Sequence, residues 1–533
     1  MINPDMYPNG LEFDKELHDE IRSHFVNIDS DSFGKRIFFE NSGGSLRLKA
    51  CLDAVVENDA HPDCGGRHQK QADIAKEVVE DGYNDLRTLF GCGKEGSIAT
   101  CLSASQVMFQ IIGAITDAVP GKNIVVSVLE HPSGFDSVEY YAKKHGLELR
   151  VMRSNPRTGG IDVSEVTRLV DKDTVLMSCM YSCNITGAVM DIPAFVKAAR
   201  EIKPDLFIVV DCVQHVPHAP VDVLALDVDA VDIAPYKFFG CRGSGVAWLS
   251  ERCAKLPHNR ILCYPEDWWE LGSVAPHQFA GYTAIVDYVC WIGSKFIEST
   301  DRRELFVEGM TRIELHERAL LYRALEGTEA VPGLRRIPGV KVQCDNPDLT
   351  KRDFILPITF DNIDPISRNH GMFMRPDGTC MVSGDEGVWA IDAEMRVTKL
   401  LDMPVSDLFM YDLDGDGADE MVCISPFHGD RLSVLKEQSG NWTELCGCGI
   451  NFGHSVYAGV CGGPFVLSCS RAGDKRTDIW SFTCDSGRYA LESSEFTSGV
   501  GAANIVVKSV GKSIVFYAAD HGCGEVARYT VTR

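Results

Sequence analysis

The sequence predicts an α/β domain with a mostly parallel sheet, followed by an all-β domain built like a propeller. Between residues 95 and 250, continuous apolar runs alternate with helical runs, which is typical of strands buried on both faces of a parallel sheet. After about residue 370, helical periodicity stops and short strand-like runs recur between turn residues. The 533 residues are too many for one ordinary domain. We therefore expect domains at residues 1–360 and 370–533.

The elements of the α/β domain follow from its hydrophobic pattern. Strands of the main sheet are expected at residues 96–102, 122–129, 147–153, 174–182, 206–214, 228–233 and 245–250. Helices between them are expected at residues 105–119, 134–146, 163–172 and 192–203. Two long amphipathic helices follow at residues 284–297 and 302–325. Residues 338–344 and 353–363 are expected to form strands of a smaller domain.

The all-β domain is predicted from strand-like segments separated by turns, such as residues 372–384, 408–425 and 477–491. The segments recur with a loose period of about 45 residues, which fits propeller blades of four strands each. The region has room for about four blades, which is few for a closed ring. A β-sandwich is the alternative architecture.

Charge and composition limit the possible partners and the cell compartment. The formal net charge of −24 argues against nucleic acid as a partner, because nucleic-acid binding needs basic patches. No apolar run is long enough for a membrane span, and the first residues do not resemble a signal peptide. The 20 cysteines are scattered, with no pairs at zinc-site spacing. We therefore expect free thiols and a cytoplasmic protein.

Polar side chains are expected at the carboxyl ends of several strands of the main sheet. Lys237 follows the strand at residues 228–233 and precedes a glycine-rich turn, Asp211 ends another strand, and Gln214 comes three residues later. Ligands of open α/β sheets bind at this edge. The other candidates there are Ala104, Ser105, His131 and Asn184.

Each of these residues also has an ordinary structural explanation. Alone, Lys237 is most simply a surface lysine, Ser105 a helix N-cap and His131 a loop histidine. Together they match what pyridoxal phosphate requires, namely a helix N-terminus for the phosphate, a lysine for a Schiff base and a carboxylate for the pyridine nitrogen. A buried, ionised Asp211 needs such a positively charged partner.

Six segments resemble class V aminotransferases of fold type I, the family that includes the cysteine desulfurases. They are FFENSGGSLRL (38–48), LSASQ (102–106), EHPSG (130–134), SCNITG (182–187), VVDCVQHVPHAPVDV (209–223) and APYKFFGCRGSG (234–245). The resemblance covers roughly residues 15–360 and is greatest to the cysteine desulfurase-like branch. It implies a homodimeric enzyme that uses pyridoxal 5′-phosphate.

The resemblance implies a role for each matching residue. Lys237 would form the Schiff base, Asp211 would pair with the pyridine nitrogen, and His131 would stack on the ring. Gln214 and Asn184 would hold the phenolic oxygen of the cofactor. The complete implied set for the cofactor is Ala104, Ser105, His131, Asn184, Asp211, Gln214, Tyr236, Lys237 and Ser273, where Ala104 and Ser105 hold the phosphate and Ser273 reaches the phosphate of the partner subunit; Asn41 and Ser42 are implied to lie near the substrate.

The sequence departs from the family pattern in four ways. Ala234 stands where the family usually has Ser or Thr, and Tyr236 stands where a His is common. The β-rich region begins where a helical small domain should follow, so we expect a truncated small domain without its carboxylate-binding arginine. A cysteine nucleophile is not evident. Cys380 is the one candidate, although the PDG before it is typical of a hairpin turn.

An acidic loop, YDLDGDGADEM at residues 411–421, lies in the all-β domain. Its alternating carboxylates could surround one hard cation, and its glycines permit a tight turn. The loop resembles the calcium loop of FG-GAP propeller blades, which implies the side-chain ligands Asp412, Asp414, Asp416 and Glu420. An acidic, solvated hairpin without a metal is the alternative.

The leading functional prediction is a pyridoxal phosphate enzyme that acts on an amino acid. The resemblance places C–S bond cleavage, as in cysteine desulfurases, first and amino transfer second. The alternative is a catalytically impaired scaffold whose propeller binds a protein partner, because a carboxylate-binding arginine and a cysteine nucleophile are not evident. The intact Lys237, Asp211 and His131 favour the enzyme.

Overall fold

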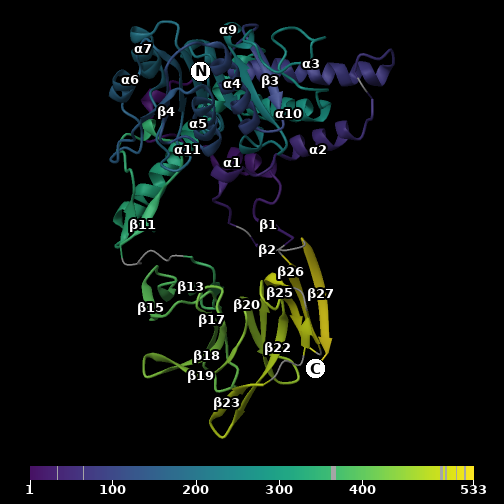
Figure 1. The fold of residues 1–533 in the computed structure, drawn as a ribbon, viewed down its shortest axis with the longest axis vertical. Coiled ribbons are helices and arrows are strands. Elements are labelled where there is room, and N and C mark those ends of the chain that lie inside the picture. Colours follow the sequence, from purple (N-terminus) through teal and green to yellow (C-terminus); the bar gives the residue numbers. More distant parts are fainter. Residues whose placement is uncertain are drawn as a thin grey trace. The chain divides into compact units, whose positions relative to one another are not determined.

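The chain forms two compact units, Met1–Thr359 and Phe360–Arg533. The structure, a computed structural model, describes residues 1–32, 34–35, 37–63, 65–361, 368–492, 496–498, 501–511, 513–520 and 524–532. Each unit has hydrophobic clusters of its own. The first unit contains the helices and a central sheet, and the second consists of strands (Figure 1).

A seven-stranded sheet forms the centre of the first unit, in the order β3-β9-β8-β7-β6-β4-β5. Neighbouring strands from β8 to β5 pair in parallel, whereas β9 is antiparallel to both β3 and β8. The predicted α/β fold with a mostly parallel sheet is thus confirmed. The strands are β3 (Ser97–Cys101), β4 (Asn123–Ser127), β5 (Glu148–Met152), β6 (Thr174–Met180), β7 (Phe207–Asp211), β8 (Ala230–Ile233) and β9 (Gly245–Leu249).

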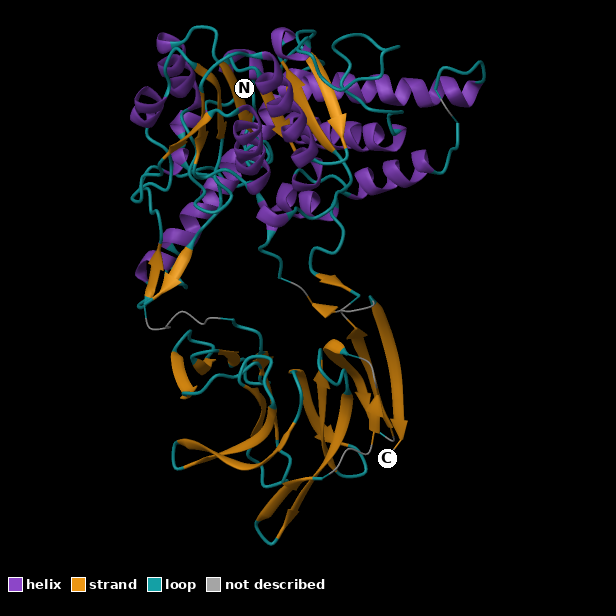
Figure 2. Cartoon of the chain, viewed as in Figure 1, coloured by secondary structure: helices purple, strands orange, loops and turns teal. Residues whose placement is uncertain are grey.

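Helices surround this sheet (Figure 2). The hydrophobic pattern correctly predicted α4 to α7 and the two long helices, α10 and α11, but not the short α8 and α9. It did not predict the three helices before the sheet, α1 to α3, of which α2 and α3 pack against α10. The α-helices are α1 (Lys15–Ser23), α2 (Lys49–Asp59), α3 (Lys70–Phe90), α4 (Ala104–Ala118), α5 (Pro132–His145), α6 (Val163–Leu169), α7 (Ile192–Ile202), α8 (Val223–Leu226), α9 (Glu251–Ala254), α10 (Pro276–Ser294) and α11 (Arg302–Glu326).

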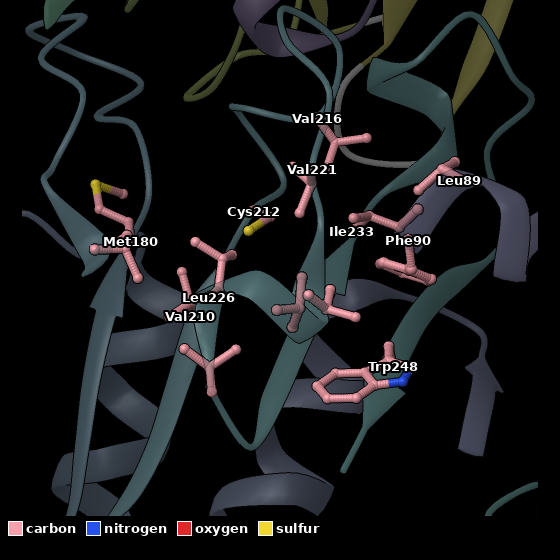
Figure 3. Packing of buried hydrophobic residues seen from close by; sticks show 14 of the residues in the cluster. Leu89, Phe90, Met180, Val210, Cys212, Val216, Val221, Leu226, Ile233 and Trp248 are labelled. Carbon is pink, nitrogen blue, oxygen red and sulfur yellow. The ribbon is translucent and has the colours of Figure 1, made fainter. Parts of the chain in front are cut away.

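Two hydrophobic clusters lie on opposite faces of the sheet. Successive side chains of a strand point to opposite faces, so Val210 belongs to one cluster and Val209 to the other. Every residue of β7 is buried. Figure 3 shows part of the larger cluster, with Val210, Ile233 and Trp248 packed among their neighbours. Burial on both faces explains the continuous apolar runs of the central strands.

The first unit has little structure after α11. A two-stranded sheet joins β10 (Val340–Val342) and β11 (Ile358–Phe360). Leu321 and Leu325 of α11 cluster with Leu349 beside it. In the described part of the chain no α-helix follows α11, which agrees with the predicted truncation of the small domain.

The described strands of the second unit form four antiparallel sheets in succession. The first strands of neighbouring sheets, β12, β16, β20 and β25, contact one another in order, as in successive propeller blades. The all-β prediction is confirmed, whereas closure into a ring stays a prediction. The strands are β12 (Met372–Met374), β13 (Cys380–Gly384), β14 (Gly387–Ile391), β15 (Val397–Leu401), β16 (Asp407–Tyr411), β17 (Glu420–Ser425), β18 (Arg431–Gln438), β19 (Asn441–Gly449), β20 (Gly453–Val460), β21 (Pro464–Ser470), β22 (Thr477–Asp485), β23 (Arg488–Leu491), β24 (Phe496–Ser498), β25 (Ala502–Val510), β26 (Ser513–Asp520) and β27 (Glu525–Thr532).

Candidate cofactor site

One pocket at the carboxyl edge of the main sheet contains nearly all of the predicted cofactor residues. The walls come from the ends of β6, β7 and β8 and from the first turns of α4 and α5. This is the edge at which open α/β sheets bind ligands. The lining residues include the predicted Ala104, Ser105, His131, Asn184, Asp211, Gln214, Tyr236 and Lys237, together with Ser103, Ser133, Met180, Val213 and Ala234.

The N-terminus of α4 lies at one side of the pocket. Ser103 is the N-cap, and its hydroxyl accepts a hydrogen bond from the backbone N–H of Gln106 at 3.2 Å. The first N–H groups of a helix have no partner within the helix and attract anions such as phosphate. Ser103 therefore takes the capping role that the sequence alone suggested for Ser105.

Glycine at position 245 lets β9 lie directly against this helix N-terminus. A Cβ atom on Gly245 would come within 2.1 Å of the backbone nitrogen of Ala104, a distance that nonbonded atoms do not tolerate. The glycine-rich turn after Lys237 thus has a definite steric purpose. It brings the chain back into the sheet without displacing the anion-binding helix.

Asp211 ends β7 at the bottom of the pocket. Its carboxylate accepts a hydrogen bond from the backbone N–H of Val213 at 2.9 Å, and the residue is only 5% exposed. Burial raises the pKa of Asp211, which the nearby positive charges of Lys237 and His131 partly oppose. A positively charged ligand atom at this position would favour the ionised carboxylate.

Lys237 lines the same pocket as Asp211 and lies in a short 3-10 helix (Pro235–Lys237) just after β8. The residue is 9% exposed. Burial lowers the pKa of its ammonium group, while Asp211 raises it. A lysine in such a place spends more time as the neutral, nucleophilic amine than a surface lysine does.

A chain of side chains behind the pocket orients Gln214. His218 Nδ1 lies 2.5 Å from a carboxylate oxygen of Glu317, and His218 Nε2 lies 3.2 Å from the Gln214 amide nitrogen. Burial lowers the pKa of His218, but Glu317 and Asp353 outweigh it and raise the pKa to about 9. Both ring nitrogens then carry protons and donate.

The protonated imidazole of His218 can only donate, so the Gln214 amide must present its oxygen, and not its nitrogen, to His218. The Gln214 oxygen is buried without a hydrogen-bond partner in the described structure, and the oxygen and nitrogen of an amide are assigned from their partners rather than observed. Rotating the amide lets the oxygen accept from His218 and turns the NH₂ group into the pocket. There it can donate to an anionic oxygen, as predicted for the phenolic oxygen of the cofactor.

His131 lines the pocket, and Arg242 packs against Tyr236, which also lines it. His131 caps α5 and is exposed, with its Nδ1 2.7 Å from the Ser133 hydroxyl. The Arg242 guanidinium lies 4.1 Å from the centre of the Tyr236 ring and donates to the backbone oxygen of Gly43 at 3.1 Å. Sequence reasoning missed Arg242, although it stands only five residues after Lys237.

The predicted substrate residues differ in their positions. Asn41 and Ser42 lie in a 3-10 helix (Asn41–Gly43) beside the Tyr236 segment, although neither lines the pocket in the described structure. Ser273 lines a neighbouring depression, with Gly243 and Ser244. Cys380 belongs to a strand of the second unit, β13, where it pairs with Met374 and Ile391. The hairpin interpretation of the PDG turn is therefore correct, and the catalytic loop expected around Cys380 is instead part of a sheet.

The acidic loop between β16 and β17 gathers its side chains around a lysine. Oxygen atoms of Asp412, Asp414 and Glu420 lie within 4.8 Å of one another. The ammonium group of Lys436 contacts Asp414, Asp416 and Glu420. The predicted acidic cluster is therefore present, and a positively charged side chain already pairs with three of its carboxylates.

Two further observations concern the cysteines and the length and apolar character of the helices. Every cysteine in the described residues is a free thiol. None of the described helices combines the length and the apolar character that crossing a bilayer requires.

Residues 37–261 match the family model described as aminotransferase class-V. A cysteine desulfurase from Haloferax volcanii is 25% identical over 292 residues, which cover 51% of this chain and 67% of that protein. The cysteine desulfurase IscS from Dictyoglomus turgidum is 33% identical over 173 residues, which cover 32% of this chain and 43% of that protein. The chain thus spans between 43% and 67% of these curated relatives.

Solved structures agree with this match. The apo structure of a cysteine desulfurase from Thermococcus onnurineus NA1 has a TM-score of 0.53 and 18% identity, covering 65% of this chain and 83% of that chain. The cysteine desulfurase CsdA from Escherichia coli has a TM-score of 0.51 and 16% identity, covering 68% of this chain and 84% of that chain. The fold predicted for the first unit is confirmed, because it is the fold of these cysteine desulfurase structures.

Proposed function

We propose that the first unit is a pyridoxal phosphate-dependent enzyme that cleaves the C–S bond of an amino acid, as cysteine desulfurases do. One observation carries the proposal: Lys237, Asp211 and a helix N-terminus come from different parts of the chain and meet in one pocket. The match to the class V family and to cysteine desulfurases supports the same activity. Amino transfer is the second candidate, because it uses the same cofactor residues.

The residues present fit the cofactor at each end. The first turn of α4 would hold the phosphate, Asp211 the pyridine nitrogen and the rotated amide of Gln214 the phenolic oxygen. The unpartnered oxygen of Gln214 is explained by this orientation. When bound, pyridoxal phosphate withdraws electrons from the substrate carbon next to its amino group.

The side chains of the chain itself move the proton and hold the charges. Because burial lowers the pKa of Lys237, its amine can take the proton from the substrate α-carbon and return it to a neighbouring atom. The carboxylate of Asp211 stabilises a positively charged ligand atom beside the end of β7. Burial of both groups limits the access of water, which strengthens their interaction.

We propose that Arg242 binds the substrate carboxylate. The guanidinium packs on the ring of Tyr236, which lines the pocket, and its positive charge lowers the pKa of Lys237. A guanidinium binds a carboxylate through two parallel hydrogen bonds. Arg242 would therefore replace the arginine that the truncated small domain does not supply.

The remaining proposals concern the oligomeric state, the role of the second unit and the location in the cell. We propose a homodimer in which Ser273 of each chain contributes to the partner's phosphate site, which the position of Ser273 outside its own pocket supports. We also propose that the second unit is an FG-GAP-like propeller that binds a protein partner. A cytoplasmic location is supported by the free thiols of the described cysteines.

The alternative is a cofactor-binding scaffold without turnover. It is favoured by the absence of an α-helix after α11 in the described residues and by the position of Cys380 in a β-strand. A desulfurase needs a nucleophile that accepts the sulfur atom. Cys380, the one candidate from the sequence, lies in a strand rather than on a loop.

The test uses the purified full-length protein. Wild type should show the visible absorbance of lysine-bound pyridoxal phosphate, and Lys237→Ala should lose it, whereas Lys255→Ala, which removes an exposed lysine paired with Glu251, should keep it. Addition of cysteine together with a thiol reductant should release alanine and sulfide, because the thiol reduces the sulfur atom removed from cysteine. A colourless wild type would refute the cofactor site. A coloured protein without spectral change on adding amino acids would favour the scaffold.

A further inference from the structure

Three histidines of the second unit converge, one from each of three successive sheets. His370 precedes β12, His428 lies between β17 and β18, and His454 lies in β20. A ring nitrogen of each lies within 4.8 Å of a ring nitrogen of the other two. The ring centres of His370 and His454 are 4.2 Å apart, and those of His428 and His454 are 4.9 Å apart.

Two of these imidazoles have ring nitrogens that are buried without a hydrogen-bond partner. His454 is 5% exposed, and its Nδ1 has no partner in the described structure; the same holds for His428 Nε2. A buried polar atom without a partner costs free energy. Such atoms in a native protein indicate a missing water, ion or ligand.

The other side of the His454 ring is already occupied. The ring makes a hydrogen bond with the backbone of Ala503, and its Nε2 lies 3.5 Å from the Arg471 guanidinium. A guanidinium only donates and a backbone carbonyl only accepts, so a metal ion on Nδ1, the unpartnered nitrogen, requires the tautomer that carries the proton on Nε2 and gives up the contact with Arg471. Metal-binding histidines characteristically donate the second ring nitrogen to a carbonyl or carboxylate, and the backbone of Ala503 offers this ring such a carbonyl.

We propose that His370, His428 and His454 bind a divalent transition-metal ion, with Zn²⁺ the first candidate. Imidazole nitrogens suit zinc, copper and nickel, whereas calcium and magnesium prefer oxygen ligands. Zinc binds histidine at about 2.0–2.1 Å, so the three nitrogens would move together by roughly 1 Å. Three protein ligands leave one tetrahedral position for water or another ligand.

The surrounding charges limit which ions fit. Arg471 at His454 and Arg368, which interacts with His428, both oppose a cation. Arg368 is partly neutralised by Asp385 at 2.8 Å. The site therefore favours ions that form strong bonds to imidazole over ions held mainly by charge.

A packing cluster without a metal is the competing explanation. The His428 ring stacks on Phe427 with a centre-to-centre distance of 4.0 Å and lies 4.7 Å from Phe452. Aromatic contacts of this kind stabilise a fold without any ion. They do not explain the two unpartnered nitrogens.

Metal binding is tested on the full-length protein after treatment with a chelator. We expect zinc titrated against a competing indicator to bind wild type and His145→Ala alike, because His145 lies in the first unit on Asp117. His370→Ala and His454→Ala should bind at least about 10-fold more weakly. Equal affinity in all four proteins would overturn the proposal.

Cobalt distinguishes the histidine site from the many thiols. Bound Co²⁺ should give visible d–d bands without thiolate-to-metal charge transfer in wild type, and His428→Asn, at a partly exposed position, should lose them while its circular dichroism is unchanged. Charge-transfer bands that persist in His428→Asn would assign the metal to cysteines and overturn the proposal. So would a wild type that binds neither Zn²⁺ nor Co²⁺, because the cluster is then aromatic packing alone.

Discussion

The ammonium group of Lys436 lies 2.6 Å from a carboxylate oxygen of Asp414, inside the acidic loop that follows β16. It also lies 2.8 Å from Asp416 and 2.6 Å from Glu420. Burial opposes its charge, but the three carboxylates outweigh burial and raise the pKa of Lys436. A loop that looks like a calcium site in sequence thus holds a positively charged side chain from β18 among its carboxylates.

Removing this lysine should create a calcium site. We expect the melting temperature of wild type to be the same in calcium and in chelator, and that of Lys436→Met to rise by about 5 °C in calcium, because a ligand that binds only the folded state stabilises it. Lys399→Met, which removes an exposed lysine paired with Asp402, serves as the control. A calcium-dependent rise in wild type would mean that the metal displaces Lys436.

The pair of His218 and Glu317 should make stability depend on pH. The folded pKa of His218, about 9, is above its ordinary value of 6.5, so its contribution is complete below pH 6.5 and is lost as pH rises through 9. The shift corresponds to about 3 kcal/mol at most. Glu317→Gln should therefore melt well below wild type at pH 6 and close to it at pH 9.5.

The control for this pH dependence is Glu201→Gln, an exposed carboxylate on α7. Its melting temperature should follow wild type at both pH values. A constant difference between wild type and Glu317→Gln across this range would show that His218 does not titrate with Glu317. The pairing would then be structural only.

The sequence predicted the main sheet well because its signals are local. Strands buried on both faces are continuous apolar runs, and the cofactor residues stand at their ends, so Asp211 and Lys237 could be placed together before the structure was known. The helices α1 to α3 were missed, and the first two contribute little to the core, because α1 buries only Leu17 and α2 buries only Cys51.

Contacts between distant segments could not be predicted. Nothing local indicates that Lys436 in β18 reaches the loop at residues 412–420, because the contact depends on the pairing of β17 with β18. Likewise, His218 and Glu317 meet across 99 residues. Their pairing determines how Gln214 is oriented, and only the folded chain shows it.

Gly245→Ala should weaken cofactor binding. The added Cβ would come within 2.1 Å of the Ala104 nitrogen, so the N-terminus of α4 must shift and its N–H groups lose their position at the phosphate. We expect pyridoxal phosphate to bind at least about 10-fold more weakly and the protein to be destabilised by about 1–3 kcal/mol. Fluorescence titration of the cofactor-free protein measures the affinity.

Gly65→Ala is the matched control for this change, because its Cβ would meet only Lys76 at 3.8 Å, an ordinary contact. It should bind the cofactor like wild type. Unchanged cofactor affinity in Gly245→Ala would mean that the first turn of α4 does not hold the phosphate.

Arg242→Ala should impair substrate binding and leave the cofactor in place. A charge-assisted hydrogen bond contributes about 1.5–3 kcal/mol, so the cysteine concentration that gives half of the spectral change should rise about 10- to 100-fold. Arg242→Lys should recover part of this loss, since lysine keeps the charge but not the paired hydrogen bonds. Arg168→Ala removes a surface arginine paired with Glu165 and should behave like wild type.

The spectral titration separates two failures in the Arg242 experiment. If Arg242→Ala loses the visible absorbance itself, the arginine supports the cofactor through Tyr236 and Gly43 rather than the substrate. If the absorbance and the half-saturating cysteine concentration both stay unchanged, another group binds the carboxylate. Only a weaker response to cysteine with intact absorbance places the guanidinium on the substrate, because the absorbance reports the bound cofactor and the half-saturating concentration reports the binding of cysteine.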